Sequence, residues 1–253
     1  MIYLFFMLHI FAAYSWMYMQ YNSKPIKIWK GMSNNLKGFA RNWFIKRAEV
    51  AGIPWKKCTE KYSEKHTMNE LEFLKYRIEN RSIEYPEYYL QPFHGYDEGN
   101  LEWKAAIEGE SATYSISANY WKNISFDDAH QWLRYNVSKN IHNYLRLCEI
   151  HPKYITHILD IGCSIGMSSE YLANSFQDSK VHGIDLSPYF LAIAAHRESQ
   201  HENGINYLHA NAERIPLKDE SINMVCMNLM LHEVPYFARM EILKEIYRIL
   251  TPD

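Results

Sequence analysis

The stretch I-L-D-I-G-C-S-I-G at residues 158–166 decides the fold of this chain. An apolar run of strand character ends in an acid, Asp160, and a turn containing Gly162 and Gly166 then leads into a helical pattern. The two glycines remove side chains where a ligand must approach the backbone, and the start of the following helix supplies free N–H groups. The order strand, glycine turn, helix predicts a ligand site at the carboxyl end of the strand.

The residues after this stretch continue the alternation of short apolar runs with amphipathic helices. We expect strands at 155–161, 180–185, 205–210 and 222–227, and helices at 167–176, 188–200 and 236–250. An alternation of strands and helices with short turns is typical of an α/β fold with a doubly wound parallel sheet. In such sheets, ligands bind at the carboxyl ends of the strands.

Acidic and polar residues recur where these expected strands end. Asp185 closes the second strand, 19 residues after Gly166. A carboxylate at that point can accept hydrogen bonds from both ribose hydroxyls of a nucleoside cofactor. Two further polar segments follow the third and fourth strands, at residues 209–216 and 227–235.

The glycine turn differs from the fingerprint of dinucleotide-binding enzymes, which reads G-x-G-x-x-G. Here the sequence is G-C-S-I-G-M, with Ser164 where the second glycine would stand. The acid Asp160 at the strand end suits a cationic amine better than a diphosphate. Both differences disfavour an NAD-dependent oxidoreductase.

The residues at 38–149 have the pattern of a helical, aromatic-rich cap. Helices are expected in pieces over 38–80, interrupted at Gly52 and Pro54, and then at 101–118 and 126–147. The N-caps expected for three of the helices are Asn100, Ser125 or Asp127, and Ser187 followed by Pro188. The aromatic stripe that begins with Phe39 and Trp43 is expected to be core. The segment with His94, Tyr96, Asp97 and Glu98 is expected to brace the N-terminal helices on the sheet, the alternative being a substrate lid.

The chain begins with an apolar segment, residues 1–20, followed by a polar and basic linker at 21–37. Residues 2–19 are almost long enough to span the hydrocarbon core of a bilayer, and Lys24, Lys27 and Lys30 would keep the following domain on the cytosolic side. The alternatives are a packed helix and an extension introduced by the gene model. A cleaved signal peptide fits less well, because no Lys or Arg precedes the apolar run.

Composition narrows the classes of partner. With 27 Lys+Arg and 29 Asp+Glu, the net charge is -2, which disfavours a dedicated nucleic-acid-binding protein. The four cysteines form no CxxC pair, so we expect no metal site and a reducing compartment. Cys163 and Cys226 are expected to be small fillers at strand ends.

Together the motifs resemble those of one enzyme family. D-x-G-C-S-x-G, G-x-D-L-S-P, A-N-A-E-x-x-P-L and L-H-E-V-P, over residues 155–253, are similar to the class I S-adenosylmethionine-dependent methyltransferases. The resemblance implies a Rossmann-like domain at 150–253 and methyl transfer from S-adenosyl-L-methionine to an unidentified small-molecule acceptor. The upstream sequence, with Y-P-x-Y-Y followed by P-F-H-x-Y-D-E-G-N-L, resembles a little-characterised group of plant methyltransferase-domain proteins. That likeness implies a plastid location, the alternative being a membrane-anchored protein that faces the cytosol.

The resemblance also implies roles for individual residues. The methionine part of the cofactor would lie among Asp160, Gly162, Cys163, Ser164 and Gly166, the ribose on Asp185, and the adenine against Leu186, Asn211 and Ala212, with Asn228 facing the methionine and the substrate. The family commonly has an acid at the position of Asn211. The sequence explains Asn211 equally well as an adenine contact or as a residue that stabilises a loop turn. His232 and Glu233 are candidates for a general base, with His232 favoured, the alternative being that the two residues only end a turn before Pro235.

The family's R-x-L-x-P-G-G step is cut off here at Pro252. We therefore expect the C-terminal strands of the sheet to be missing and residues 222–227 to form an open edge. On this hypothesis the chain is a fragment or an incomplete gene model that binds cofactor weakly. The alternative function is a non-catalytic cofactor-binding or scaffold protein.

Overall fold

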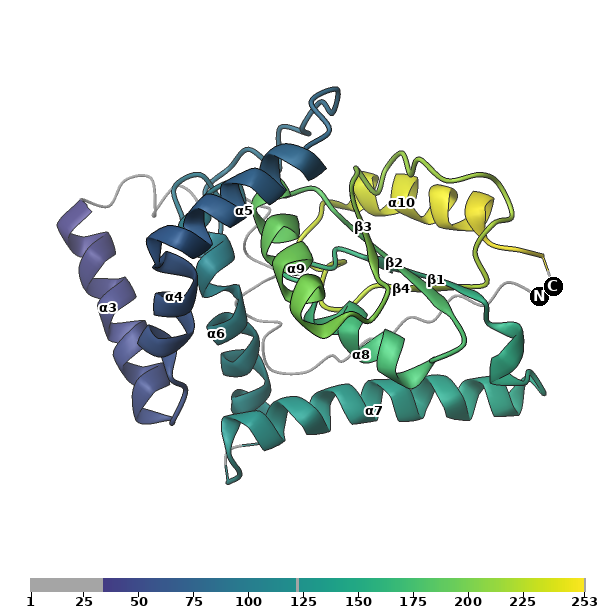
Figure 1. Cartoon of the computed structure of the whole chain (residues 1–253), viewed down its shortest axis with the longest axis horizontal. Helices are drawn as coiled ribbons and strands as arrows, with labels where there is room; N and C mark the ends of the chain where they lie inside the picture. The colour runs from purple at the N-terminus through teal and green to yellow at the C-terminus, as the bar shows by residue number, and fades with distance from the viewer. Residues whose placement is uncertain (1–33, 122, 253) are drawn as a thin grey trace.

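The C-terminal half of the chain is a parallel sheet in a computed structural model that describes residues 34–121 and 123–252 (Figure 1). Its strands are β1 (His157–Ile161), β2 (Lys180–Asp185), β3 (Asn206–His209) and β4 (Met224–Cys226). They are ordered β3-β2-β1-β4, and every pairing is parallel. This is the predicted Rossmann-like arrangement, with crossovers on both sides of β1.

Helices cover both faces of the sheet, because apolar side chains alternate between the two sides of each buried strand. Ile158 packs with residues of α7 (Phe126–Leu147), α8 (Met167–Ser175) and α9 (Pro188–His201). Its neighbour Leu159 packs on the opposite face, with Ile242 and Ile246 of α10 (Tyr236–Ile249). The sheet is therefore the middle layer of three.

The upstream helices form a cap beside α9, at the left of Figure 1. They are α3 (Asn34–Val50), α4 (Trp55–Ser63), α5 (Lys65–Ile78) and α6 (Trp103–Tyr120). Leu71 of α5 and Ala106 of α6 are fully buried in one cluster with Ile165 and Ile193 of the sheet domain. The cap and the sheet domain thus share a core.

Two of the three expected helix caps are confirmed. The Ser125 side chain accepts from the N–H of Asp128 at 3.0 Å, and that of Ser187 accepts from the N–H of Phe190 at 3.2 Å. The expectation for Asn100 is wrong, because α6 begins after Glu102 with no side-chain cap. The Asn100 carbonyl instead accepts from the Ser187 hydroxyl at 2.6 Å and ties the cap to the start of α9.

Two further expectations for the cap need correction. Helix α3 begins at Asn34, so the last four residues of the expected linker, 34–37, are helical. Phe39 and Trp43 were expected in the core, yet they are 71% and 56% exposed.

No helix among the described residues has the length and apolarity needed to cross a bilayer. The expectations for residues 1–20, and for the linker up to residue 33, lie outside the described residues.

Residues 222–227 were expected to form an open edge of the sheet, but the first of them pairs with another segment. Ile222 forms a parallel bridge with Leu250, and the Thr251 N–H donates to the Ile222 carbonyl at 2.9 Å. The residues after α10 therefore run beside the approach to β4. The strand itself pairs with β1 on its other side.

Candidate functional site

The loop between β1 and α8 is held tightly against the end of β2. The N–H groups of Gly162 and Cys163 both donate to the Ile184 carbonyl, at 2.8 and 3.1 Å. Gly162, Ser164 and Gly166 all have positive φ, of 69°, 52° and 85°. A left-handed conformation favours glycine at two of these positions, and Ser164 adopts it despite its side chain.

Asp185 connects this loop to the next helix through one carboxylate. Its Oδ2 accepts from the N–H of Ser164 at 2.9 Å, and its Oδ1 accepts from the N–H of Ser187 at 2.8 Å. Burial raises the pKa of Asp185 to about 6, against the opposing effect of these backbone hydrogen bonds. Each carboxylate oxygen can accept a further hydrogen bond, and the residue is partly exposed.

Asp160 is the second acid at this edge, and it is fully buried. Its Oδ2 accepts from the hydroxyls of Ser168 and Ser169, at 2.6 and 2.7 Å, and burial raises its pKa. Its Oδ1 has no hydrogen-bond partner of normal geometry among the described residues, although the Asn228 side chain and the charge of Arg134 both act to lower the pKa of this carboxyl. An unpartnered buried carboxylate oxygen fits an ammonium donor such as the amino group of a methionine moiety.

The loop after β4 packs on the glycine turn. A Cβ atom placed on Gly162 would lie 2.7 Å from Cγ of Met230, which leaves no room for a side chain at residue 162. The same loop carries Asn228, His232 and Glu233. The first, second and fourth strands therefore contribute to one cluster, as predicted.

His209, the last residue of β3, fastens the cap to this edge. Its Nδ1 accepts from the N–H of Asn80 at 2.9 Å, so the ring proton lies on Nε2 and points toward the carbonyl of Leu186 at 3.1 Å. The hydroxyl of Tyr85 lies 3.2 Å from the same Nε2. Burial lowers the pKa of His209, which keeps the ring neutral.

The residues expected at the adenine edge lie in a turn next to His209. Oδ1 of Asn211 accepts from the N–H of Glu213 at 2.9 Å, which is the loop-turn role considered from the sequence. The adenine contacts expected for Asn211 and Ala212 stay predictions. Tyr88 of the cap donates to Glu213 at 2.6 Å and lies over this turn.

A carboxylate between two imidazoles forms the side of the site nearest the cap. Oε1 of Glu233 lies 3.3 Å from Nε2 of His94 and 3.6 Å from Nε2 of His232. Burial alone would raise the pKa of Glu233, but the two imidazoles outweigh it and lower the pKa to about 2. Tyr89 is near Asp185 and Glu233, and burial raises its pKa well above the usual value.

Two of the residues at 94–98 make contacts that agree with the expected bracing role. Tyr96 donates to Glu108 of α6 at 2.7 Å, which is a bracing contact. His94 reaches Glu233 in the loop after β4, which braces the cap on the sheet domain. It is therefore part of the cluster at the carboxyl edge.

Cys163 lies in the glycine turn, where its surroundings disfavour the thiolate form. It is buried, and burial with the nearby acids Asp185 and Asp160 raises the pKa of its thiol well above the usual value. Cys226 is likewise a buried thiol, as expected for a strand-end filler. The described residues contain no group of three or more side chains arranged to hold a metal ion.

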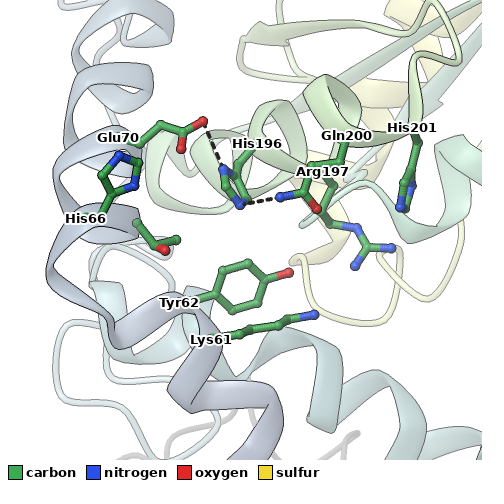
Figure 2. A pocket seen from close by; sticks show the side chains of 9 residues that line it. Lys61, Tyr62, His66, Glu70, His196, Arg197, Gln200 and His201 are labelled. Atoms are coloured by element: carbon green, nitrogen blue, oxygen red, sulfur yellow. Dashed lines mark hydrogen bonds and ion pairs between the residues drawn. The ribbon is translucent and has the colours of Figure 1, made fainter.

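A polar pocket of about 370 Å³ lies elsewhere, between α4, α5 and the second half of α9 (Figure 2). Its charged groups are already paired: Lys61 with Glu110, and Arg197 with Glu170 through two hydrogen bonds of 2.7 Å. Helix α9 starts at the carboxyl edge of the sheet, so its second half lies toward the opposite edge. None of the predicted site residues lines this pocket.

Comparisons with known proteins agree with the geometry of the carboxyl edge. A family described as "Methyltransferase domain" matches residues 158–253. The match begins in β1 and includes the glycine turn, Asp185 and the loop after β4.

Characterised relatives of the methyltransferase domain act on different acceptors. Malonyl-[acyl-carrier protein] O-methyltransferase of Marinomonas sp. is 32% identical over 95 residues, which are 38% of this chain and 34% of that protein. Demethylmenaquinone methyltransferase of Bacillus mycoides is 28% identical over 110 residues, 43% of this chain and 45% of that protein. This chain thus spans less than half the length of either relative.

Solved structures are also similar. Phosphoethanolamine N-methyltransferase 2 of Haemonchus contortus, in complex with phosphomonomethylethanolamine and S-adenosylhomocysteine, matches with 28% identity and a TM-score of 0.35 over 38% of this chain and 22% of that one. An S-adenosyl-L-methionine-dependent methyltransferase structure from Methanococcus maripaludis matches with 18% identity and a TM-score of 0.46 over 68% of this chain and 64% of that one.

Sequence reasoning found the methyltransferase domain's own side of the site and missed the part that the cap supplies. The sequence indicated no role for Tyr85, Tyr89 or His209, and it indicated Glu233 only as a candidate general base beside His232. Their signal is weak in the sequence, since 124 positions separate Tyr85 from His209. The Y-P-x-Y-Y motif is the feature that marks this part of the cap.

Proposed function

We propose that the chain is an S-adenosylmethionine-dependent methyltransferase that acts on a small-molecule acceptor. The observation that carries the proposal is that the Asp185 carboxylate can accept hydrogen bonds from the backbone and from a ligand at the same time. It fixes the glycine turn through Ser164 and still has lone pairs to accept the ribose hydroxyls. The named activities of the two relatives support an acceptor of low molecular weight or one carried on an acyl-carrier protein.

The residues of the site fit the parts of this cofactor. The unpartnered oxygen of Asp160 would accept from the amino group of the methionine moiety. The bare backbone at Gly162 and Gly166 would allow that moiety to lie close to the turn. Leu186 would pack on the adenine, and Asn228 would face the methionine and the acceptor.

When bound, the cofactor supplies an electrophilic methyl group on a sulfonium, and S-adenosylhomocysteine leaves when a nucleophile takes that methyl group. The chain's own contribution is to orient the two reactants and to exclude water. Water would be excluded by three tyrosines of the cap that cover the carboxyl edge, Tyr85, Tyr88 and Tyr89. His232, with its imidazole beside the ionised Glu233, would accept a proton from an acceptor that carries one.

Calorimetric titration of S-adenosylhomocysteine into the full chain tests the binding step. We expect saturable heat with one site per chain, and no saturable heat with NADH. Formation of S-adenosylhomocysteine from S-adenosylmethionine, followed across a panel of amine, phenol and carboxylic acid acceptors, tests turnover. Binding without turnover for every class would favour the non-catalytic alternative, and no binding by a folded sample would refute both.

The affinity for S-adenosylhomocysteine should fall as the pH decreases through about 6. The pKa of Asp185 is raised from 3.8 to about 6, and only the ionised carboxylate can accept from both ribose hydroxyls. Protonation should therefore weaken binding about tenfold between about pH 7.5 and about pH 5. Titrations at several pH values check this.

The matched control for this pH dependence is Asp185→Asn. Its affinity should be lower than that of the wild type and nearly flat over the same range, because the amide does not titrate. Glu233 should not contribute, because its pKa is near 2. A wild-type affinity that is independent of pH would contradict the assignment of Asp185 to the ribose.

A further inference from the structure

The outward face of α3 carries large apolar side chains that nothing in the described residues covers. Phe39, Trp43 and Val50 are 71%, 56% and 83% exposed. Their spacings of four and seven residues place them along one line of the helix. An exposed apolar line of this kind is typical of a surface that binds a membrane or another protein.

The orientation of this line is fixed by the opposite face of α3. Ala48 is buried in a cluster with Ile53 and Trp55, and Ile45 packs against the same cluster. Arg41, on the same inward side, pairs with Glu108 of α6. The helix therefore cannot turn its apolar line inward without breaking these contacts.

Basic residues border the apolar line on both sides. At 100° per residue, Lys46 lies on one flank of the Phe39–Trp43–Val50 line and Arg47 on the other. Both are exposed, and neither makes an ion pair with another described residue. The Arg47 guanidinium lies 5.5 Å from the centre of the Trp43 ring, so cation and aromatic ring lie together at the surface.

We propose that α3 lies flat on an anionic lipid surface, with Phe39, Trp43 and Val50 entering the headgroup boundary. A helix with aromatic and aliphatic residues on one line and Lys or Arg on its flanks is suited to this position. Long basic side chains extend from such a helix to anionic headgroups, each adding to the attraction. A second copy of this chain would instead bring like charges together along both flanks.

The sequence before α3 has matching character. Residues 2–19 are apolar, and Lys24, Lys27 and Lys30 stand between them and the helix. A lipid surface that attracts Lys46 and Arg47 would attract these lysines too. The inference does not depend on methyl transfer, because α3 contributes no residue to the cluster at the carboxyl edge.

Co-sedimentation of the full chain with lipid vesicles tests the proposal. We expect binding to vesicles of phosphatidylcholine with phosphatidylglycerol, and weaker binding to phosphatidylcholine alone. The double variant Phe39→Ser/Trp43→Ser should bind the anionic vesicles roughly tenfold more weakly or worse. The matched control is Trp132→Ser/Tyr135→Ser on α7, which removes two aromatic residues of similar exposure and should bind as the wild type does.

The charge contribution has its own pair of variants. Lys46→Glu/Arg47→Glu should lose preference for the anionic vesicles, whereas Lys56→Glu/Lys57→Glu, an exposed basic pair on α4, should retain it. Circular dichroism shows whether each variant is folded. Equal binding by wild type and Phe39→Ser/Trp43→Ser, or no wild-type binding to anionic vesicles, would overturn the proposal.

The depth of the Trp43 side chain in the lipid can also be measured. Vesicles containing brominated phosphatidylcholine should quench tryptophan fluorescence of the wild type, and Trp43→Phe should bind equally well but lose most of the quenching. Self-association that disappears in Phe39→Ser/Trp43→Ser, without any quenching in the wild type, would assign the face to a contact between copies instead.

Discussion

Replacing Asp185 by alanine should weaken the binding of S-adenosylhomocysteine by about 100-fold or more. The variant loses two hydrogen bonds from ribose hydroxyls to a charged acceptor, each worth about 1.5–3 kcal/mol. It also releases the N–H groups of Ser164 and Ser187, so the glycine turn loses its side-chain attachment to the end of β2 and keeps only the backbone bonds to Ile184. Both effects act on the cofactor side of the site. Calorimetric titration measures the change.

Asp178→Ala is the matched control for this experiment. Asp178 is an exposed acid just before β2, at the opposite end of the strand from Asp185. Its replacement changes the net charge equally and should leave the affinity unchanged. A thermal melt of Asp185→Ala shows whether lost affinity reflects lost folding. A folded Asp185→Ala variant with wild-type affinity would show that the ribose is not bound there.

The sheet domain could be predicted from the sequence because its signals are local. β2 and α7 have the bounds expected from hydrophobic pattern and capping residues. Asp160 is the penultimate residue of β1 and Asp185 is the last residue of β2, and parallel strands bring their carboxyl ends to one edge. Position along the chain was therefore enough to place both acids in one site.

The contribution of the cap could not be predicted in the same way. The contacts of Tyr85 with His209 and of His94 with Glu233 join residues 124 and 139 positions apart. No periodicity within either segment encodes such pairs. The bracing role expected of His94 and Tyr96 agrees with their contacts, but the sequence named neither partner, Glu233 nor Glu108.

The failure at α3 has a different cause. Phe39 and Trp43 have the spacing of a helix face. Periodicity predicts that they share this face, but not whether the face packs on the protein or stays exposed. The opposite face, with Ile45 and Ala48, is the one that packs on the protein. A helix with apolar residues on both sides is compatible with two orientations. The tertiary contacts of Arg41 and Ala48 decide between them.

Replacing Gly166 by alanine should lower the free energy of unfolding by about 3 kcal/mol or more. At a φ of 85°, an alanine pays about 1–2 kcal/mol for the left-handed backbone. Its Cβ would also lie 2.4 Å from the hydroxyl oxygen of Tyr207 and 3.2 Å from Cβ of Ala194, and overpacking of this kind adds about 1–3 kcal/mol. Urea denaturation followed by circular dichroism measures the loss.

Two further variants separate the backbone and steric contributions to this loss. Gly204 has a φ of 75° with nothing within 4 Å of its Cβ position, so Gly204→Ala should show the backbone cost alone. Tyr207→Phe removes the clashing hydroxyl, which is buried without a partner, so this variant alone should be neutral or slightly stabilising. In Gly166→Ala/Tyr207→Phe the loss should shrink toward that of Gly204→Ala. If Gly166→Ala costs no more than Gly204→Ala, the glycine is required for its φ and not for the space beside Tyr207.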